Sequence, residues 1–207
     1  MTTNRRNVLA TITAGTATAL AGSTLKSMIS RANAAASSGL ISDGSVVSQN
    51  KAPLIEVPGL PTRLFLESSE SMNRLSVVEH TLGPALLGAP MHTHHNEDEY
   101  SFVMEGTLSA QLGDEVVHVA PGSLLKKPRG IPHAFWNEGT TPLRFVEMIS
   151  PGGFERFFID IAKLDPNSFK SPDDYMAEIA RVGETGYNVV FDFSGLEELM
   201  TKHSLTM

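Results

Sequence analysis

The chain has 207 residues, which suits one domain with extensions, and its 41% hydrophobic and 19% charged residues are ordinary for a globular protein. A formal net charge of -7 makes nucleic acid and anionic membrane surfaces poor partners. Because cysteine is absent, disulfide scaffolds, thiolate metal sites, iron–sulfur clusters and cysteine nucleophiles are excluded. Any metal must therefore be held by histidine, carboxylate, carbonyl or water.

Residues 1–36 carry the features of an export signal. Arg5-Arg6, followed after one residue by Val8-Leu9, resembles the twin-arginine signal of bacteria. The weakly apolar stretch that follows is too polar for a membrane span, and Ala32-Asn33-Ala34 has the small-x-small pattern of a cleavage site, with cleavage at 34–36. A Sec signal and a disordered basic N-terminus are the alternatives. We expect export to the periplasm and no stable membrane span after cleavage.

Residues 37–61 are rich in serine, glycine and proline and end in Val57-Pro58-Gly59-Leu60-Pro61. This composition is typical of a connecting segment. We therefore expect a linker or an N-terminal arm that lies on the surface of the following domain.

Residues 62–150 have a different texture, in which short runs of alternating apolar residues are broken by glycine and proline. Many short strands with close turns indicate an antiparallel sandwich or barrel, so the predicted fold class is all-β, a small antiparallel β-barrel or jelly roll. The predicted strands are 62–66, 75–82, 99–105, 107–112, 115–119, 123–126, 133–137 and 143–149.

Residues 151–207 form a C-terminal extension with helical spacing of apolar residues. The pattern predicts helices over 154–164 and 173–182, the second beginning at Ser171-Pro172-Asp173. We expect these helices to pack outside the barrel. Their phenylalanine-rich stripe is more typical of core or subunit contact than of a cofactor site, which leaves a homodimer open.

Three candidate metal ligands lie within eight positions of one another. His92 and His94 are two residues apart, so on a strand they point to the same face, while Glu99 begins the next extended run. Nitrogen and oxygen donors that converge in this way suit a divalent metal. A second segment, Gly122 to His133, uses proline and glycine to present His133 at the start of a strand.

The two segments together resemble the paired motifs of the cupin superfamily. The first motif has the form G-x5-H-x-H-x(3,4)-E-x6-G, and everything after its opening glycine matches. The second has the form G-x5-P-x-G-x2-H-x3-N and matches at every fixed position. The resemblance covers roughly residues 62 to 150. The matching residues are His92, His94, Glu99 and Gly106 in the first motif, and Gly122, Pro128, Gly130, His133 and Asn137 in the second.

This resemblance implies a small antiparallel barrel with one metal inside it, held by His92, His94, Glu99 and His133. Three imidazoles and one carboxylate leave two positions open on an octahedral ion, where a substrate, with or without dioxygen, can bind. Fe, Mn, Ni and Co all fit this site. Zn fits too, although it prefers four ligands.

Other polar residues near the motif have less defined roles. His95 is expected at the rim, because its side chain faces away from that of His94. Glu97 and Asp98 are interpreted as a solvated acidic turn, although Asp98 takes the ligand role if the register slips by one residue. His80 and His203 have no companion residues in the sequence pattern.

The leading hypothesis for function is an oxygenase. The barrel-plus-helices plan resembles small quercetin-2,3-dioxygenase-like cupins, which implies dioxygen and a small phenolic or flavonol-like substrate, with Glu99 as both ligand and catalytic base. The cavity lining is expected to include Phe102 or Val103, Phe135 and Met148. Two alternatives are an oxygen-independent metal-dependent isomerase or lyase, and a non-catalytic metal or ligand binder.

Overall fold

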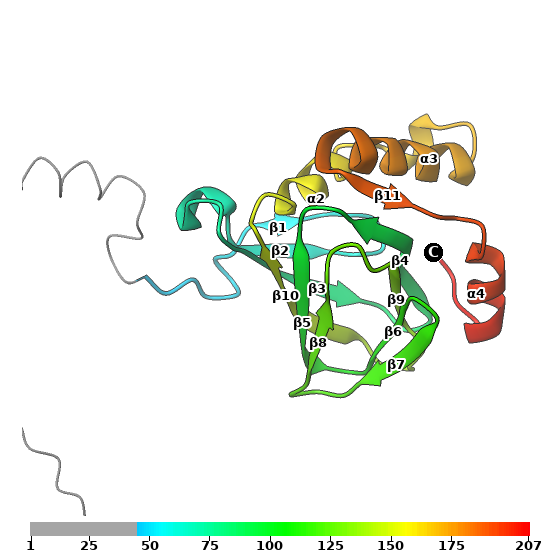
Figure 1. Cartoon of the computed structure of the whole chain (residues 1–207), viewed down its shortest axis with the longest axis horizontal. Coiled ribbons are helices and arrows are strands. Elements are labelled where there is room, and N and C mark those ends of the chain that lie inside the picture. Colours follow the sequence, from blue (N-terminus) through cyan, green and yellow to red (C-terminus); the bar gives the residue numbers. More distant parts are fainter. Residues whose placement is uncertain (1–44) are drawn as a thin grey trace, which may run out of the picture. The chain divides into compact units, whose positions relative to one another are not determined.

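The computed structural model describes residues 45–207 (Figure 1). The predicted signal at residues 1–36 and the start of the predicted arm, residues 37–44, lie outside the described residues. Within the described part, no helix is long and apolar enough to cross a membrane.

The described strands form two antiparallel sheets that together enclose the core. The first sheet has six strands in the order β1-β2-β3-β10-β5-β8. Three neighbouring strands, β3, β10 and β5, bring the chain segments before, after and within the motifs side by side. Its strands are β1 (Leu54–Ile55), β2 (Thr62–Leu66), β3 (Ser76–Leu82), β10 (Leu143–Ser150), β5 (Asp98–Glu105) and β8 (Leu124–Lys127).

The second sheet has five strands in the order β11-β4-β9-β6-β7. It places the two histidine-bearing segments next to each other, because β4 pairs with β9. Its strands are β11 (Val189–Phe191), β4 (Leu86–His94), β9 (His133–Asn137), β6 (Leu108–Leu112) and β7 (Glu115–Val119).

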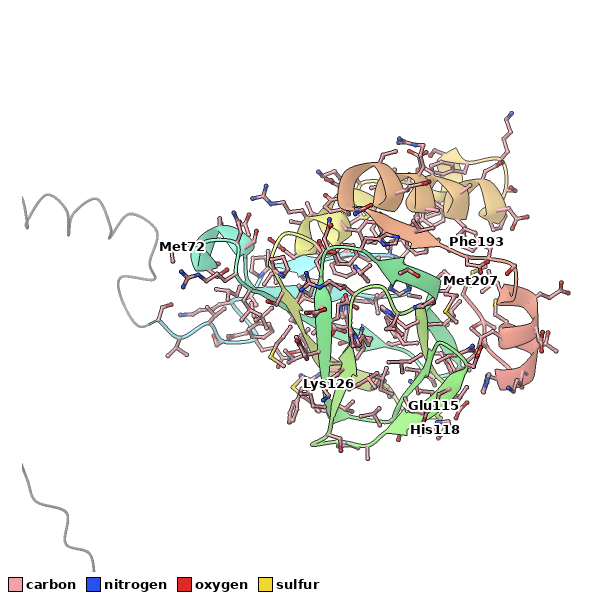
Figure 2. The ribbon with its side chains drawn as sticks, viewed as in Figure 1. Met72, Glu115, His118, Lys126, Phe193 and Met207 are labelled. Carbon is pink, nitrogen blue, oxygen red and sulfur yellow. The ribbon has the colours of Figure 1, made fainter. Side chains whose placement is uncertain are left out.

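Alternation of buried and exposed positions explains why these segments are strands. In β10, every second side chain from Leu143 to Ile149 is buried, and the residues between them are partly exposed. Such alternation is what a strand with one face on a core requires. Outward-pointing side chains, including those of Glu115, His118 and Lys126, stand on the outside of the barrel (Figure 2).

The eight predicted strands are all present, with ends that agree to within one residue. The prediction missed β4, because Gly88 and Pro90 are typical breakers of a strand. Its ladder with β9 changes register on both sides of Ala89, so these residues lie at an irregular stretch where a missing N–H is tolerated. The short strands β1 and β11 were also missed.

The helices follow the barrel in sequence, as predicted. The side chain of Ser171 accepts a hydrogen bond from the backbone N–H of Asp174, and Pro172 opens the helix, so the predicted start signal is the observed one. The final helix was not predicted. The helical elements are η1 (Ser68–Ser71), α2 (Glu155–Ile161), η2 (Pro166–Ser168), α3 (Pro172–Val182), η3 (Gly183–Tyr187) and α4 (Leu196–His203).

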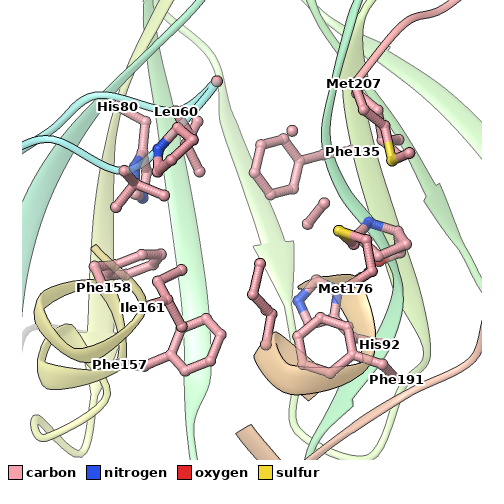
Figure 3. A pocket seen from close by; sticks show the side chains of 18 of the residues that line it. Leu60, His80, His92, Phe135, Phe157, Phe158, Ile161, Met176, Phe191 and Met207 are labelled. Atoms are coloured by element: carbon pink, nitrogen blue, oxygen red, sulfur yellow. Dashed lines mark hydrogen bonds between the residues drawn. The ribbon is translucent and has the colours of Figure 1, made fainter. Parts of the chain in front are cut away.

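The C-terminal elements cover one end of the barrel, where α2, α3 and β11 lie in Figure 1. Strand β11 extends the second sheet along β4, and Phe157 and Phe158 of α2 point toward the barrel interior. A cavity of about 390 Å³ remains between barrel and helices (Figure 3). The phenylalanine stripe, interpreted from sequence as core or subunit contact, therefore belongs to the core and also lines this cavity.

Candidate metal centre

The four predicted ligands are brought together at the helix-covered end of the barrel. His92 and His94 are buried on one face of β4, and His133, the first residue of β9, is the register partner of His92. Glu99 comes from β5 in the opposite sheet and is also buried. One side-chain nitrogen or oxygen from each residue lies within 4.8 Å of all the others.

Backbone carbonyls orient two of the imidazoles. Nδ1 of His92 lies 2.8 Å from the carbonyl oxygen of Pro90, and Nδ1 of His133 lies 3.0 Å from that of Ile131. Since a carbonyl only accepts hydrogen bonds, each Nδ1 carries the proton and each Nε2 keeps its lone pair. Both Nε2 atoms are then free to act as metal ligands, with the outer nitrogen held in the way that metal-binding histidines usually require.

The donor atoms fit a transition-metal ion. Nε2 of His94 is buried without a hydrogen-bond partner in residues 45–207, and it lies 3.5 Å from Oε1 of Glu99. Nε2 of His133 lies 3.3 Å from Oε2 of the same carboxylate. Two ligands bound about 2.1 Å from one ion are separated by roughly 3 to 4 Å, so these spacings match a common centre.

The electrostatics favour the protonation states that bind metal. Burial, followed by the neighbouring histidines, holds the pKa of His92 well below its usual value, and burial also lowers the pKa of His133. Both rings are therefore neutral at neutral pH. Burial opposes ionisation of Glu99, but the charges of Lys127 and His94 outweigh it and hold the pKa of this carboxyl well below its usual range.

Lys127 is a buried cation beside the candidate metal centre, and sequence reasoning missed it. Its Nζ lies 2.8 Å from Oε2 of Glu99 and 2.8 Å from Oε2 of Glu147, and 2% of its side chain is exposed. Burial opposes its charge, but Glu147 and Glu99 together raise the pKa of the lysine. A buried lysine is rarely tolerated unless it is paired in this way.

Glu147 completes this buried charge network. Its Oε2 accepts hydrogen bonds from the Ser101 hydroxyl and from Lys127, both at 2.8 Å, while its Oε1 has no partner among the described residues. Burial raises the pKa of Glu147 to about 7, although Lys127 opposes the rise. The group can therefore give or take a proton near neutral pH.

Four neighbouring strands of the first sheet each supply one polar side chain to the cavity. Across β3, β10, β5 and β8 these are His80, Glu147, Glu99 and Lys127. His92 is the other histidine in the lining, and most of the remaining lining is apolar. We call the four residues the polar stripe.

Aromatic rings form the wall of the cavity around the histidines. The ring centroid of Phe154 lies 4.4 Å from that of His94, and the centroid of Phe191 lies 5.5 Å from that of His92. Phe135 lines the cavity, as predicted. Val103 is fully buried but is not part of the lining, and Phe102 and Met148 point outward, because each alternates with inward-facing residues on its strand.

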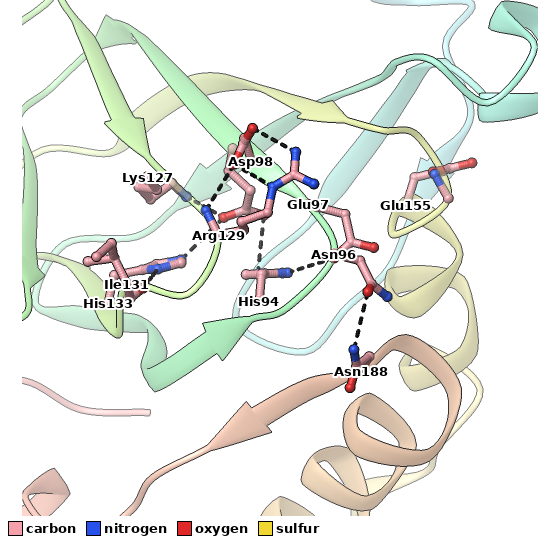
Figure 4. Close-up of polar contacts among 12 residues, drawn as sticks. His94, Asn96, Glu97, Asp98, Lys127, Arg129, Ile131, His133, Glu155 and Asn188 are labelled. Atoms are coloured by element: carbon pink, nitrogen blue, oxygen red, sulfur yellow. Dashed lines mark hydrogen bonds and ion pairs between the residues drawn. The ribbon is translucent and has the colours of Figure 1, made fainter.

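The acidic turn before Glu99 is less exposed to solvent than predicted, and its carboxylates have partners in the protein. Glu97 is buried, and its Oε2 lies 3.4 Å from Nδ1 of His94, so it faces a candidate ligand and not solvent. Asp98 points away from the centre and binds Arg129 at 2.8 and 3.0 Å (Figure 4). Hydrogen bonds from Arg129 lower the pKa of Asp98 to about 2. The alternative register, with Asp98 as ligand, is wrong, and His95 is exposed as expected.

Comparison with protein families agrees with this architecture. Residues 78–149 match the family described as the cupin domain. The matched segment is about a third of the chain. It spans β3 to β10 and contains all four candidate ligands. Among curated proteins, none matches the chain.

Solved structures of other proteins are similar to about half of the chain. KdgF from Halomonas sp. is 17% identical, with 54% of this chain and 99% of that chain covered and a TM-score of 0.48. A predicted oxalate decarboxylase from Thermotoga maritima is 19% identical, with 52% and 99% covered and a TM-score of 0.47. The polyketide cyclase RemF from Streptomyces resistomycificus is 23% identical, with 52% and 80% covered and a TM-score of 0.46. None of these likenesses bears on the reaction.

Proposed function

We propose that this cupin is a metal-dependent dioxygenase that acts on a small phenolic or flavonol-like substrate. The observation that carries the proposal is the buried cluster of three histidines and one glutamate beside a cavity of about 390 Å³ with a mainly apolar, partly aromatic lining. Such a lining favours flat apolar molecules, and the few polar groups within it fix their orientation.

In this proposal His92, His94, His133 and Glu99 hold a divalent ion such as Fe or Mn, which supplies open positions for a substrate oxygen and dioxygen. The neutral imidazoles anchor the ion, and the phenylalanines exclude water from the cavity. Phe154 and Phe191 pack directly on His94 and His92, so the C-terminal extension also fixes the ligand rings.

Two carboxyl groups are candidates for the proton acceptor. Glu99 lines the cavity, and we propose it as the group that takes the substrate proton while it remains a ligand. Lys127 weakens its basicity, because it donates a hydrogen bond to Oε2. Glu147 lines the same cavity, has a pKa near 7 and is the second candidate.

Oxygen uptake tests the proposal. The chain is purified from its native compartment, its metal content is measured, and the Fe- and Mn-loaded forms are given a panel of flavonols and catechols. We expect turnover in air, no turnover without oxygen, and recovery when air is readmitted. Conversion of any compound of the panel without consumption of oxygen would contradict a dioxygenase.

Glu99→Gln and Glu147→Gln then separate the two candidate bases. The comparison is made at equal metal content, since Glu99 is also a proposed ligand. If Glu99→Gln retains metal and turns over normally while Glu147→Gln is slow, Glu147 is the base. Tight metal retention with no turnover in any condition would favour a non-catalytic metal binder.

The polar stripe supports a second candidate function, that of an oxygen-independent isomerase or lyase. Such a reaction needs acid–base groups next to the metal, and Glu147 and Lys127 are candidates for them. The same protein incubated anaerobically with small hydroxy acids and sugars separates the two candidates. Conversion that proceeds without oxygen would support the second one.

A further inference from the structure

His80 lies in the cavity wall but takes no part in the candidate metal centre. It is on β3, two strands away from Glu99 in the first sheet, and 2% of the residue is exposed. In Figure 3 it lies on the side of the cavity opposite His92, next to Leu60 and Phe158. The rings of Phe158 and Phe145 pack on it, with centroids 4.9 and 5.1 Å away, and hold its orientation.

The hydrogen bonds around His80 fix its tautomer. The hydroxyl of Thr62 donates its one proton to the carbonyl oxygen of Leu60 at 2.8 Å. The same hydroxyl oxygen lies 2.9 Å from Nδ1 of His80 and must accept there, because it has no second proton to donate. Nδ1 therefore carries the ring proton. Nε2 keeps a lone pair and has no hydrogen-bond partner within residues 45–207.

A neutral ring with a bare Nε2 is a hydrogen-bond acceptor in an otherwise apolar part of the wall. Burial, and then the charge of Lys127, lower the pKa of His80 to about 3, so the ring is neutral at neutral pH. His80 lines the cavity, so a ligand that fills the cavity covers this acceptor. A ligand that brings a donor pairs with it, whereas a ligand of the same shape without a donor leaves it buried and unpaired, which is unfavourable.

We propose that Nε2 of His80 accepts a hydrogen bond from a ligand hydroxyl, and that the cavity therefore selects ring-sized apolar molecules that carry a hydroxyl in addition to the group directed at the metal. That this ligand is a substrate rests on the proposed dioxygenase function. The hydrogen bond itself does not depend on that function.

Binding of two matched probes tests this specificity. Phenol and toluene have nearly the same shape, and phenol alone carries a donor. Their affinities are measured by calorimetry on the full chain loaded with zinc, which prevents oxidation of the probes. We expect the wild type to prefer phenol, and His80→Phe, which keeps the aromatic packing, to reduce this preference by roughly three- to tenfold. The quantity compared is the ratio of phenol affinity to toluene affinity in each protein. Any contact of phenol with the metal that the wild type and His80→Phe share raises this ratio equally in both, so it does not affect the comparison.

Thr62→Val provides a variant that leaves the His80 ring in place. It removes the group that fixes the tautomer, so the preference for phenol should fall although the ring is still present. The tautomer is also read directly from the ¹⁵N shifts of His80, which should show a protonated Nδ1 and a bare Nε2 in the wild type. This reading remains decisive even where His80→Phe fails to fold.

Several outcomes would overturn the inference. These are the opposite tautomer in the wild type, no binding or equal binding of the two probes, or a preference for phenol that survives His80→Phe and disappears in Glu147→Met. The last result would assign the acceptor role to the unpartnered Oε1 of Glu147. Absence of oxygen uptake alongside a His80-dependent preference would reject the dioxygenase and leave the His80 site standing.

Discussion

Nζ of Lys127 lies 2.8 Å from Oε2 of Glu99, so a buried cation is hydrogen-bonded to a carboxylate that is also a candidate metal ligand. The two residues are register partners on β8 and β5, which fixes their approach through the backbone. A metal bound at the candidate centre and Lys127 therefore share one carboxylate. The lysine neutralises Glu99 and Glu147 in the metal-free protein, and it repels a cation that binds nearby.

Lys127→Met should have opposite effects on folding and on metal binding. In the metal-free protein it leaves two buried carboxyl groups without their cation, which we expect to lower the free energy of unfolding by about 3–5 kcal/mol. In the same variant the affinity for a divalent metal should rise, by roughly tenfold, because a nearby positive charge is gone. Denaturant unfolding with and without metal, together with metal titration, measures both effects.

Lys126→Met is the matched control, since Lys126 is the preceding residue of the same strand and points to solvent (Figure 2). It should change neither quantity appreciably. Equal losses of stability in the two variants, or weaker metal binding by Lys127→Met, would contradict the role given to the buried lysine.

Removal of the metal should lower the stability of the domain. An ion present at one hundred times its Kd adds about 2.7 kcal/mol to the free energy of unfolding. A chelator should therefore lower the melting temperature of the wild type and leave that of His133→Gln unchanged. His95→Gln, which alters an exposed histidine near the ligands, should respond to the chelator as the wild type does. A wild type that melts at one temperature with or without metal and chelator would count against the centre.

The candidate ligand set could be predicted because its local signals resemble the paired motifs of the cupin superfamily. His92 and His94 share a face through the two-residue period of a strand, and Pro128 and Gly130 force the turn that presents His133. Each of these constraints acts within a few residues of the chain. The strands that carry the motifs were predicted for the same reason, with the exception of β4, whose irregular ladder is set by its partner β9.

The polar stripe could not be predicted, because it depends on which strands become neighbours. His80, Glu147 and Lys127 are far apart in the chain and meet only through the order β3-β10-β5-β8. Lys127 also illustrates how sensitive such predictions are to strand ends. The predicted strand stopped at Lys126, whereas the observed one ends at Lys127, and one residue decides which lysine faces the cavity.

Glu138 should make the docking of the C-terminal helix depend on pH. It accepts a hydrogen bond from Nε1 of Trp136 at 3.1 Å and lies 2.8 Å from Nδ1 of His203 on α4, with His118 also beside it. Burial favours the neutral acid, but the hydrogen bonds from Trp136 and His203 lower the pKa of Glu138 below its usual value.

The pKa of Glu138 is lower in the folded state than in the unfolded state, where a glutamate has a pKa of about 4.3. The contribution of Glu138 to the free energy of unfolding is therefore full above about pH 4.3. It is lost as the pH falls through the pKa of the folded state. The difference in unfolding free energy between wild type and Glu138→Gln should therefore be present near pH 6 and shrink below about pH 4. Trp136 is the single tryptophan, so its fluorescence follows the unfolding directly. A difference that stays constant over this range would contradict the linkage.

Two glycines of the cupin motifs should respond differently to alanine. Gly106 and Gly130 both have positive φ, 75° and 77°, where an alanine costs about 1–2 kcal/mol. A Cβ at Gly106 would also lie 2.7 Å from the carbonyl oxygen of Pro142, whereas a Cβ at Gly130 meets nothing within 4 Å. Gly106→Ala should therefore destabilise the domain by roughly 1–3 kcal/mol more than Gly130→Ala, because the rigid backbone at the start of β10 must move. Denaturant unfolding of the two variants under one condition measures this difference. If the losses are equal, φ alone explains the first motif's glycine, and close approach of the backbone has no part in it.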